Sequence, residues 1–168
     1  MSKYLEKLEF EGLYKRIPKP IRKIFNWGRS FSIWPIHYVT GCCSPEFMQV
    51  CGPRYDMERW GILPMASTRQ SDAIFFVGNV TRKMMKRAIR LYHQMPEPRY
   101  VVNIGVCTIS KGPFYDSYSV VKVEDYLPVD VYVSGCPPKP EAILYGALVL
   151  RKKILGEKVG IVRRELEE

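Results

Sequence analysis

Residues 72–107 read DAIFFVGNVTRKMMKRAIRLYHQMPEPRYVVNIGVC, and this stretch gives the clearest indication of the fold class. The run from Asp72 to Asn79 is short and mostly apolar, which predicts a buried strand. From Thr81 to Met95 apolar residues recur at helical spacing among basic ones, and Thr81 or Asn79 is the expected N-cap. A second buried strand is predicted over residues 99–105. A strand, a helix and a strand in this order indicate a parallel pair joined by a crossover helix.

The same alternation continues on both sides of this unit. Residues 32–41 (SIWPIHYVTG) predict an earlier strand that a proline interrupts near its start, and residues 44–61 predict a broken helix and a loop. Residues 129–135 (VDVYVSG) predict a last strand, and residues 138–155 predict a final helix with a proline in its first turn. This order favours an α/β fold with a doubly wound, mainly parallel sheet. The 168 residues suit one such domain with a substantial core.

Four cysteines follow the predicted strands. Cys42 and Cys43 come after the first strand, Cys107 follows the strand at 99–105, and Cys136 follows the last strand. Open α/β sheets bind ligands at the carboxyl ends of their strands, so we expect the four thiols to converge at one edge. Neighbouring side chains of an extended chain point to opposite faces. The backbone at the adjacent pair must therefore leave regular geometry if both thiols bind one group.

Four converging thiolates are the ligand set of an iron–sulfur cluster. Two other interpretations compete with it, because buried cysteines are common as small apolar residues and because four cysteines can bind zinc. The C-x2-C knuckles of zinc ribbons are absent, and Gly41, Gly105 and Gly135 stand just before the cysteine positions. We therefore predict a cluster held by the four cysteines. Cys51, in the helix after the pair, is interpreted as a packing residue.

Charged residues follow the cysteine pair. Glu46 lies four residues after Cys42, in the first turn of the predicted helix, and Arg54, Asp56 and Arg59 occupy the loop and helix beyond it. Charges and hydrogen bonds near cluster sulfurs shift the reduction potential, so these residues are candidates for tuning an electron-transfer site. The alternative is a patch of surface salt bridges.

The net charge of +9 indicates an acidic partner, such as nucleic acid, anionic lipid or an acidic protein. Nucleic acid is disfavoured, because the sequence has no zinc-finger spacing, no aromatic RNA-binding signature and no basic recognition helix. No apolar run is long enough to cross a bilayer, and the N-terminus lacks an apolar signal core. We therefore expect the chain to stay in the cytoplasm.

The sequence divides into three parts, at residues 1–30, 31–156 and 157–168. In the first part, leucines recur near helical spacing before Pro18 and Pro20, which are expected to break the pattern. Six positive residues and no acid follow within residues 15–29. Such a basic amphipathic segment favours docking on a membrane surface or a partner subunit over packing on its own domain. The middle part is the α/β domain, and the last part is a charged tail.

Five stretches carry a resemblance to a known family. They are NWGRSFSIWPIHYVTGCCSPEFM (26–48), RYDMERWG (54–61), TRQSDAIFFVGN (68–79), QMPEPRYVVNIGVC (94–107) and PVDVYVSGCPPKPEAILYGAL (128–148). Together they resemble the cluster-bearing 20 kDa subunit of respiratory complex I, called B or PSST, over roughly residues 26–154. The tandem cysteines and the GCPPKPEA run are the specific motifs. The resemblance implies a flavodoxin-like fold related to the small subunit of nickel–iron hydrogenases.

The resemblance also implies a function. It predicts one [4Fe-4S] cluster, the last of an electron chain, in a subunit without catalytic side chains of its own. The implied complex is a membrane-bound, ion-translocating oxidoreductase, with this subunit peripheral at the cytoplasmic face. The implied partners are a large 49 kDa-like subunit, a ferredoxin-like cluster subunit and membrane-arm subunits. The implied cluster ligands are Cys42, Cys43, Cys107 and Cys136, and the residues implied at the acceptor cavity are Glu46, Arg54, Asp56 and Arg59.

Two departures from the family pattern leave the acceptor open. Phe47 stands where complex I has methionine, and Ser110-Lys111-Gly112 replaces Ser-Gly-Gly after the third cysteine. The acceptor is thus predicted to be quinone or a sulfur compound, because archaeal complexes such as ferredoxin-linked sulfane reductases carry a similar subunit. The small subunit of a membrane-bound nickel–iron hydrogenase is the alternative. The adjacent cysteine pair favours complex I, because relatives of hydrogenase type carry a separated C-x2-C.

Overall fold

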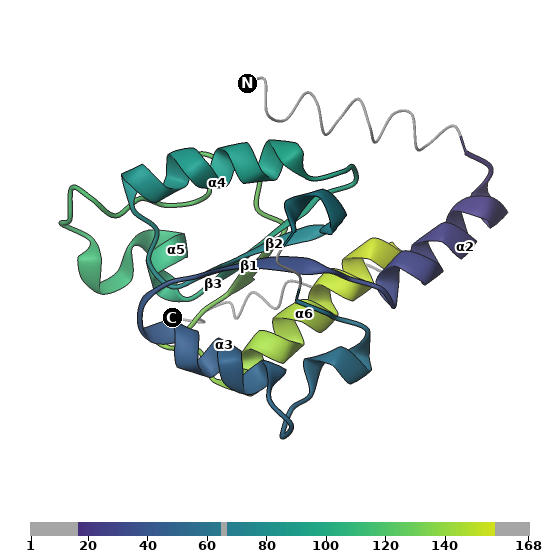
Figure 1. The fold of residues 1–168 in the computed structure, drawn as a ribbon, viewed down its shortest axis with the longest axis horizontal. Coiled ribbons are helices and arrows are strands. Elements are labelled where there is room, and N and C mark those ends of the chain that lie inside the picture. Colours follow the sequence, from purple (N-terminus) through teal and green to yellow (C-terminus); the bar gives the residue numbers. More distant parts are fainter. Residues whose placement is uncertain (1–16, 65–66, 157–168) are drawn as a thin grey trace, which may run out of the picture.

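The computed structural model describes residues 17–64 and 67–156, which form a four-stranded sheet with helices on both faces (Figure 1). The strands are β1 (Pro35–Val39), β2 (Ala73–Val77), β3 (Tyr100–Ile104) and β4 (Val131–Val133). Every neighbouring pair is parallel, and the order is β1-β2-β3-β4. The predicted α/β fold with a parallel sheet is confirmed.

Helices occur in the three predicted regions, residues 44–61, 81–95 and 138–155, and two further helices lie outside those regions, at 19–30 and 106–110. They are α2 (Lys19–Ser30), α3 (Ser44–Cys51), α4 (Arg82–Gln94), α5 (Val106–Ser110) and α6 (Pro140–Leu155), with short 3-10 turns η1 (Gly41–Cys43), η2 (Met57–Trp60), η3 (Thr68–Gln70) and η4 (Gly112–Phe114). The predicted N-cap is confirmed, since Thr81 Oγ1 accepts a hydrogen bond from the Met84 amide at 3.4 Å. Pro140 opens α6, where its missing N–H costs no helical hydrogen bond.

The first and the last predicted strands are longer than the observed ones. β1 begins at Pro35 rather than before it, because proline cannot donate to the ladder and is tolerated at the first residue of an edge strand. β4 ends at Val133, and the chain then turns through Gly135 at φ +149°.

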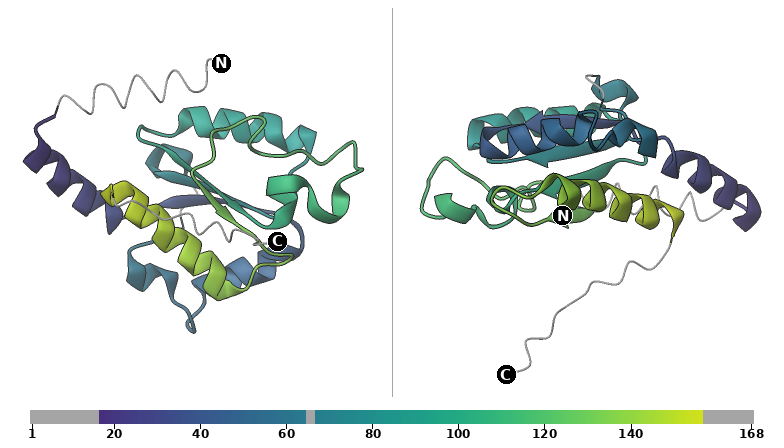
Figure 2. Two further views of the ribbon diagram at one scale, coloured as in Figure 1. Left: turned by 180° about the vertical axis from the view of Figure 1, so that it is seen from behind. Right: turned by 90° about the horizontal axis from the view of Figure 1, so that it is seen from below.

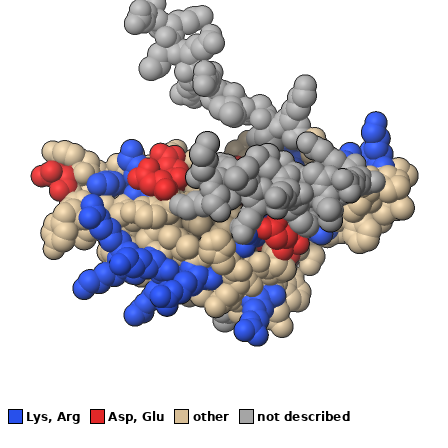
Figure 3. All heavy atoms as spheres, turned by 90° about the horizontal axis from the view of Figure 1, so that it is seen from above, with Lys and Arg blue, Asp and Glu red and all other residues tan. Residues whose placement is uncertain are grey.

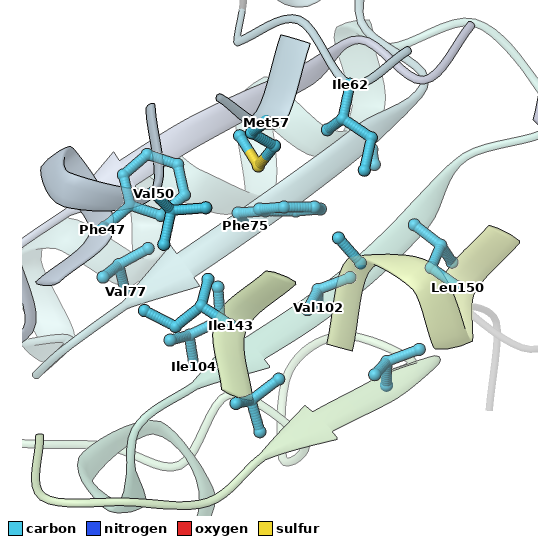
Figure 4. Close-up of a cluster of buried hydrophobic side chains, with 14 of the residues drawn as sticks. Phe47, Val50, Met57, Ile62, Phe75, Val77, Val102, Ile104, Ile143 and Leu150 are labelled. Atoms are coloured by element: carbon cyan, nitrogen blue, oxygen red, sulfur yellow. The ribbon is translucent and has the colours of Figure 1, made fainter. Parts of the chain in front are cut away.

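One face of the sheet packs against α3 and α6 (Figure 4). All five residues of β2 are buried, and its Phe75 and Val77 point into this layer. Phe47 from α3 contacts Phe75 edge-on, with ring centroids 6.4 Å apart. The main members of this core are Phe47, Val50, Met57, Ile62, Phe75, Val77, Val102, Ile104, Ile143 and Leu150. Packing of this kind orients α3 and α6, the two helices that follow the Cys42–Cys43 pair and Cys136.

The opposite face packs against α4 and the chain between α5 and β4 (Figures 1 and 2). Met85, Ala88 and Tyr92 of α4 lie over Ile74 and Phe76 of β2. This arrangement explains why the strands read as continuous apolar runs: both faces of the sheet are covered.

α2 lies beside α6, at the end of the molecule away from the short helix α5 (Figures 1 and 2). The Arg151 guanidinium of α6 stacks on the Phe31 ring, 3.5 Å from its centroid. The two prolines stand at the start of this helix: Pro18 is the N-cap, and Pro20 stands in the first turn. The leucine pattern of residues 1–16 and the tail at 157–168 lie outside the described residues. Within residues 17–64 and 67–156, no helix is both long enough and apolar enough to span a bilayer.

Candidate metal centre

The four cysteines lie at the carboxyl ends of three parallel strands, as the sequence predicts. Cys42 and Cys43 occupy η1 after β1, Cys107 lies in α5 after β3, and Cys136 follows β4. Cys43 and Cys107 are buried, whereas Cys42 and Cys136 are exposed. A group bound between them would therefore be anchored from inside by two thiols and from the surface by two others.

The thiols are near enough to influence one another's ionisation. Burial, followed by the charges of the other three cysteines and a hydrogen bond with Cys42, raises the pKa of Cys43 to about 12. Burial, followed by Cys136 and Cys42, also raises the pKa of Cys107. In the part of the chain that the structure describes, no three Cys, His, Asp or Glu side chains are close enough to hold a single metal ion. The four thiols nevertheless lie close enough for the charges of the other three to raise the pKa of Cys43.

A pocket of about 150 Å³ opens between these segments. It is lined by Gly41, Cys42, Asn79, Cys107 and Phe114. Asn79 and Phe114 were not predicted as lining residues from the sequence. Asn79 ends a predicted strand and Phe114 follows Cys107, and these positions were the available signals.

Backbone geometry explains how two adjacent cysteines reach one site. Gly41 has φ +67°, and the pair then forms a single 3-10 turn that leads into α3. The predicted departure from regular backbone geometry is confirmed. Gly105, at φ +97°, faces the pair: a Cβ there would stand 2.9 Å from Cys43 Sγ. The absence of a side chain at Gly105 thus leaves room for the Cys43 sulfur.

The donor set fits an iron–sulfur cluster. It consists of four thiols: Cys42 and Cys107 line the pocket, and the charges of Cys42, Cys107 and Cys136 all act on Cys43. Thiolates of this number and type suit iron and sulfide. The thiols must lose their protons to bind iron, and their raised pKa values oppose this loss. The positive charge of the metal favours the thiolate form and would offset that effect when the cluster binds. Cys51 stands apart, at the end of α3 and packed against the core, in agreement with its interpretation as a packing residue.

Two of the four charged candidates come together at Tyr55. Glu46 and Arg54 both act on Tyr55: their charges shift its pKa in opposite directions, and the Arg54 guanidinium lies 5.5 Å from its ring centroid. Tyr55 Oη in turn donates a hydrogen bond of 2.6 Å to Glu141 Oε1 in the first turn of α6. That bond is the largest cause of the raised pKa of Tyr55 and of the lowered pKa of Glu141.

The other two candidates belong to the next turn. Asp56 precedes η2 in the left-handed conformation, at φ +43°, and the Arg59 guanidinium lies 5.6 Å from the Trp60 ring centroid. Sequence reasoning missed Tyr55 and Glu141. Glu141 lies within the GCPPKPEA run, five residues after Cys136, and that position was the available signal.

The two departures from the family pattern lie in different places. Phe47 is buried in the core, between His37 and Phe75, so its ring packs there and not against the pocket. Lys111 ends α5 at φ +66° and begins the turn that carries Phe114 into the pocket wall. The second departure alone borders the site.

The fold and the four cysteines together define the class of protein. It is a parallel α/β domain with a thiol-lined candidate metal centre at the carboxyl edge of its sheet. Residues 41–150 match the family described as NADH ubiquinone oxidoreductase, 20 Kd subunit, and the chain belongs to that family. The resemblance seen in the sequence is confirmed.

Individual relatives agree with this assignment. The B 1 subunit of the NADH-quinone oxidoreductase of Salinispora tropica is 48% identical over 145 residues, which cover 85% of this chain and 77% of the relative. The K subunit of the chloroplastic NAD(P)H-quinone oxidoreductase of Chlorokybus atmophyticus is 50% identical over 139 residues, which cover 82% of this chain but only 51% of that relative. The chain thus spans about half the length of the chloroplastic protein.

A solved structure is also similar. It is described as the membrane-bound sulfane sulfur reductase, an archaeal respiratory membrane complex. One of its chains superimposes with a TM-score of 0.76 and 41% identity, covering 81% of this chain and 77% of that chain.

Proposed function

We propose that this chain is the electron-transfer subunit that carries the terminal [4Fe-4S] cluster of a membrane-bound, complex I-like, ion-translocating oxidoreductase. The observation that carries the proposal is that Cys42, Cys43, Cys107 and Cys136 follow three neighbouring parallel strands and lie near enough for the other three to act on the ionisation of Cys43. Membership of the complex I 20 kDa family supports it. When bound, the cluster would accept one electron and pass it on, while the protein sets its position and potential.

The chain's own residues would have separate tasks at this site. Cys43 and Cys107 would hold the cluster from the buried side, and Cys42 and Cys136 from the exposed side. Gly105 leaves space for the Cys43 sulfur. Exposure of two ligands leaves the site within reach of a partner protein, which suits electron transfer to an acceptor bound between subunits.

The three parts of the chain suggest a division of labour in the complex. Residues 31–156 would bind the cluster and a large 49 kDa-like subunit, with a ferredoxin-like cluster subunit and membrane-arm subunits as further partners. Exposed Phe114, Tyr115 and Tyr118 beside the pocket support a protein interface there. Residues 1–30 would dock at the cytoplasmic membrane surface or on a partner subunit. Its helix α2 exposes Ile24, Phe25 and Trp27 together with basic residues, as interfacial helices do. Residues 157–168 would form a charged tail.

The acceptor would be quinone or a sulfur compound. Quinone is supported by the names of the sequence relatives, and a sulfur compound by the similar chain in the sulfane sulfur reductase. Arg54 and Tyr55 would offer a fixed cation and a phenol to stabilise an anionic reduced acceptor, and Tyr55 is hydrogen-bonded to Glu141 in the helix that follows Cys136. Lys111 at the pocket border is the position to test for acceptor choice.

The test is reconstitution of the full chain with iron and sulfide without oxygen, followed by absorption and paramagnetic resonance of the reduced form. The wild type should show a brown chromophore and a [4Fe-4S] signal. Cys107→Ala and Cys136→Ala should lose both, whereas Cys51→Ala, the matched control, should keep both. A signal that survives removal of Cys107, or stoichiometric zinc in place of iron, would overturn the cluster assignment.

The acceptor is tested in the intact complex. Purified complex is assayed with a quinone analogue and with polysulfide, in the wild type and in Arg54→Ala. We expect Arg54→Ala to keep the cluster signal but to lower reduction of the true acceptor by on the order of 10²-fold, as for loss of one preorganised donor. Unchanged activity with both acceptors would show that Arg54 is a surface charge.

A further inference from the structure

One face of α4 carries an unusual concentration of positive charge. It consists of Arg82, Lys83, Lys86, Arg87 and Arg90, all exposed, and is called here the α4 basic face. The helix Arg82–Gln94 has no acidic residue. In the part of the chain that the structure describes, no ion pair involves any of the five. Figure 3, which looks down on the side that carries α4, shows Lys and Arg side chains gathered there.

The stability of the helix does not explain this pattern. Lys86 and Arg90 are four residues apart, as are Arg82 and Lys86, and like charges at this spacing destabilise a helix. The first turn contains Arg82 and Lys83 and no acid, although a helix N-terminus favours negative charge. Both arrangements lower the stability of the helix. We therefore expect this face to have a role other than stabilising the fold.

The α4 basic face adjoins the candidate metal centre. Asn79, which lines the pocket, stands three residues before Arg82. The Arg82 amide donates a 2.9 Å hydrogen bond to the Ser119 carbonyl, so the start of α4 is tied to the segment that follows Phe114 of the pocket wall. A partner seated on the first turns of α4 would therefore lie next to the pocket.

The chemistry of the face fits a protein better than a lipid surface. Helices that lie on membranes expose apolar residues beside their basic ones. α2 does so, with Ile24, Phe25 and Trp27 exposed. α4 instead buries Met85, Ala88 and Tyr92 against the sheet, and none of the exposed large apolar side chains belongs to it. A purely charged surface is suited to a complementary acidic protein.

We infer that the α4 basic face is the docking surface for an acidic electron-carrying protein domain that reduces the cluster. The inference rests on the proposed function and adds the location and the charge of the electron donor. One electron would pass from the reduced donor to the cluster, with no proton or bond change. Charge complementarity would steer the encounter and would weaken as salt screens it.

The experiment compares two double variants of the full chain with the same change in net charge. Lys86→Glu with Arg90→Glu alters the α4 basic face, and Lys19→Glu with Lys23→Glu alters exposed residues at the same spacing on α2. The probe is a small acidic ferredoxin of the two-cluster type. Its binding to the apoprotein is measured by fluorescence anisotropy at low and at high salt. The rate at which it reduces the cluster in the reconstituted chain is then measured by stopped flow.

We expect the α4 variant to weaken ferredoxin binding at low salt by on the order of tenfold and to flatten its salt dependence, and the α2 variant to bind as the wild type does. Equal loss in both variants would show an effect of net charge alone and would overturn the inference. So would unchanged binding of the α4 variant.

A second arm uses vesicles that contain phosphatidylserine. The α4 variant should bind them as the wild type does, and its loss of vesicle binding would assign the face to lipid and overturn the inference. Because the binding arm uses apoprotein, a chain that assembles no cluster would refute the proposed function while leaving the docking face measurable.

Discussion

Replacement of Gly105 by alanine tests how the site makes room for its buried thiol. Gly105 has φ +97° and ψ 148°, a region almost restricted to glycine, so alanine there should cost about 1–3 kcal/mol of unfolding free energy. Its Cβ would also stand 2.9 Å from Cys43 Sγ. To regain a contact of about 3.5 Å, the sulfur must retreat by about 0.6 Å. Cys43 is only 1% exposed, so its surroundings resist that shift.

Gly156 supplies the matched control. It also has a positive φ, +81°, but a Cβ there meets nothing within 4 Å. Gly156→Ala should therefore lose about 1–2 kcal/mol from backbone strain and leave the site unchanged.

Both variants are measured in the full chain, by denaturant unfolding of the apoprotein and by cluster content after reconstitution. Gly105→Ala should lower stability and sharply reduce cluster content, whereas Gly156→Ala should lower stability alone. Wild-type cluster content in Gly105→Ala would refute the argument that this glycine makes room for the Cys43 sulfur.

Three further substitutions test other features by denaturant unfolding. Asn103→Leu should raise the unfolding free energy by about 1–2 kcal/mol, because both polar side-chain atoms are buried and have no hydrogen-bond partner among the described residues; a fall would show that the amide has a partner in solution. Lys111→Gly should gain about 1 kcal/mol, because lysine there holds φ +66°, and a loss would show that its side chain stabilises the turn. Burial raises the pKa of Asp72, so its contribution to stability is present at low pH and is lost as the pH rises. Asp72→Asn should thus be more stable than the wild type at pH 7 and equal to it near pH 3, and the reverse order would contradict the sign.

Local features of the fold could be predicted because they depend on neighbouring residues. The apolar runs at β2 and β3 indicated buried strands, and Thr81 indicated the start of α4 by its ability to accept an amide hydrogen bond. Strand ends were harder to predict. A proline at the start of β1 and a glycine after β4 end the pairing at points that the apolar pattern does not mark.

The candidate metal centre also has some features that the sequence predicted and others that it did not. The cysteine positions followed from strand order, because parallel strands bring their carboxyl ends to one edge. The Tyr55–Glu141 hydrogen bond could not be predicted from strand order, because it joins residues 86 apart through the packing of α3 against α6. Phe47 also shows the limit: the sequence marks it as a departure from the family pattern, but only the structure shows that its ring lies in the core.

The α/β alternation, the positions of the cysteines after strands, and the family could all be predicted from the order of the amino acids. Periodicity, capping and ligand type are properties of short stretches, so they are visible in the sequence alone. Three other features became visible only in the folded chain: which thiols are buried, the position of Gly105 against Cys43 Sγ, and the gathering of the α4 charges on one exposed face next to the pocket. These features depend on which elements pack together and in what register, and that is set by the whole core at once and not by any one stretch.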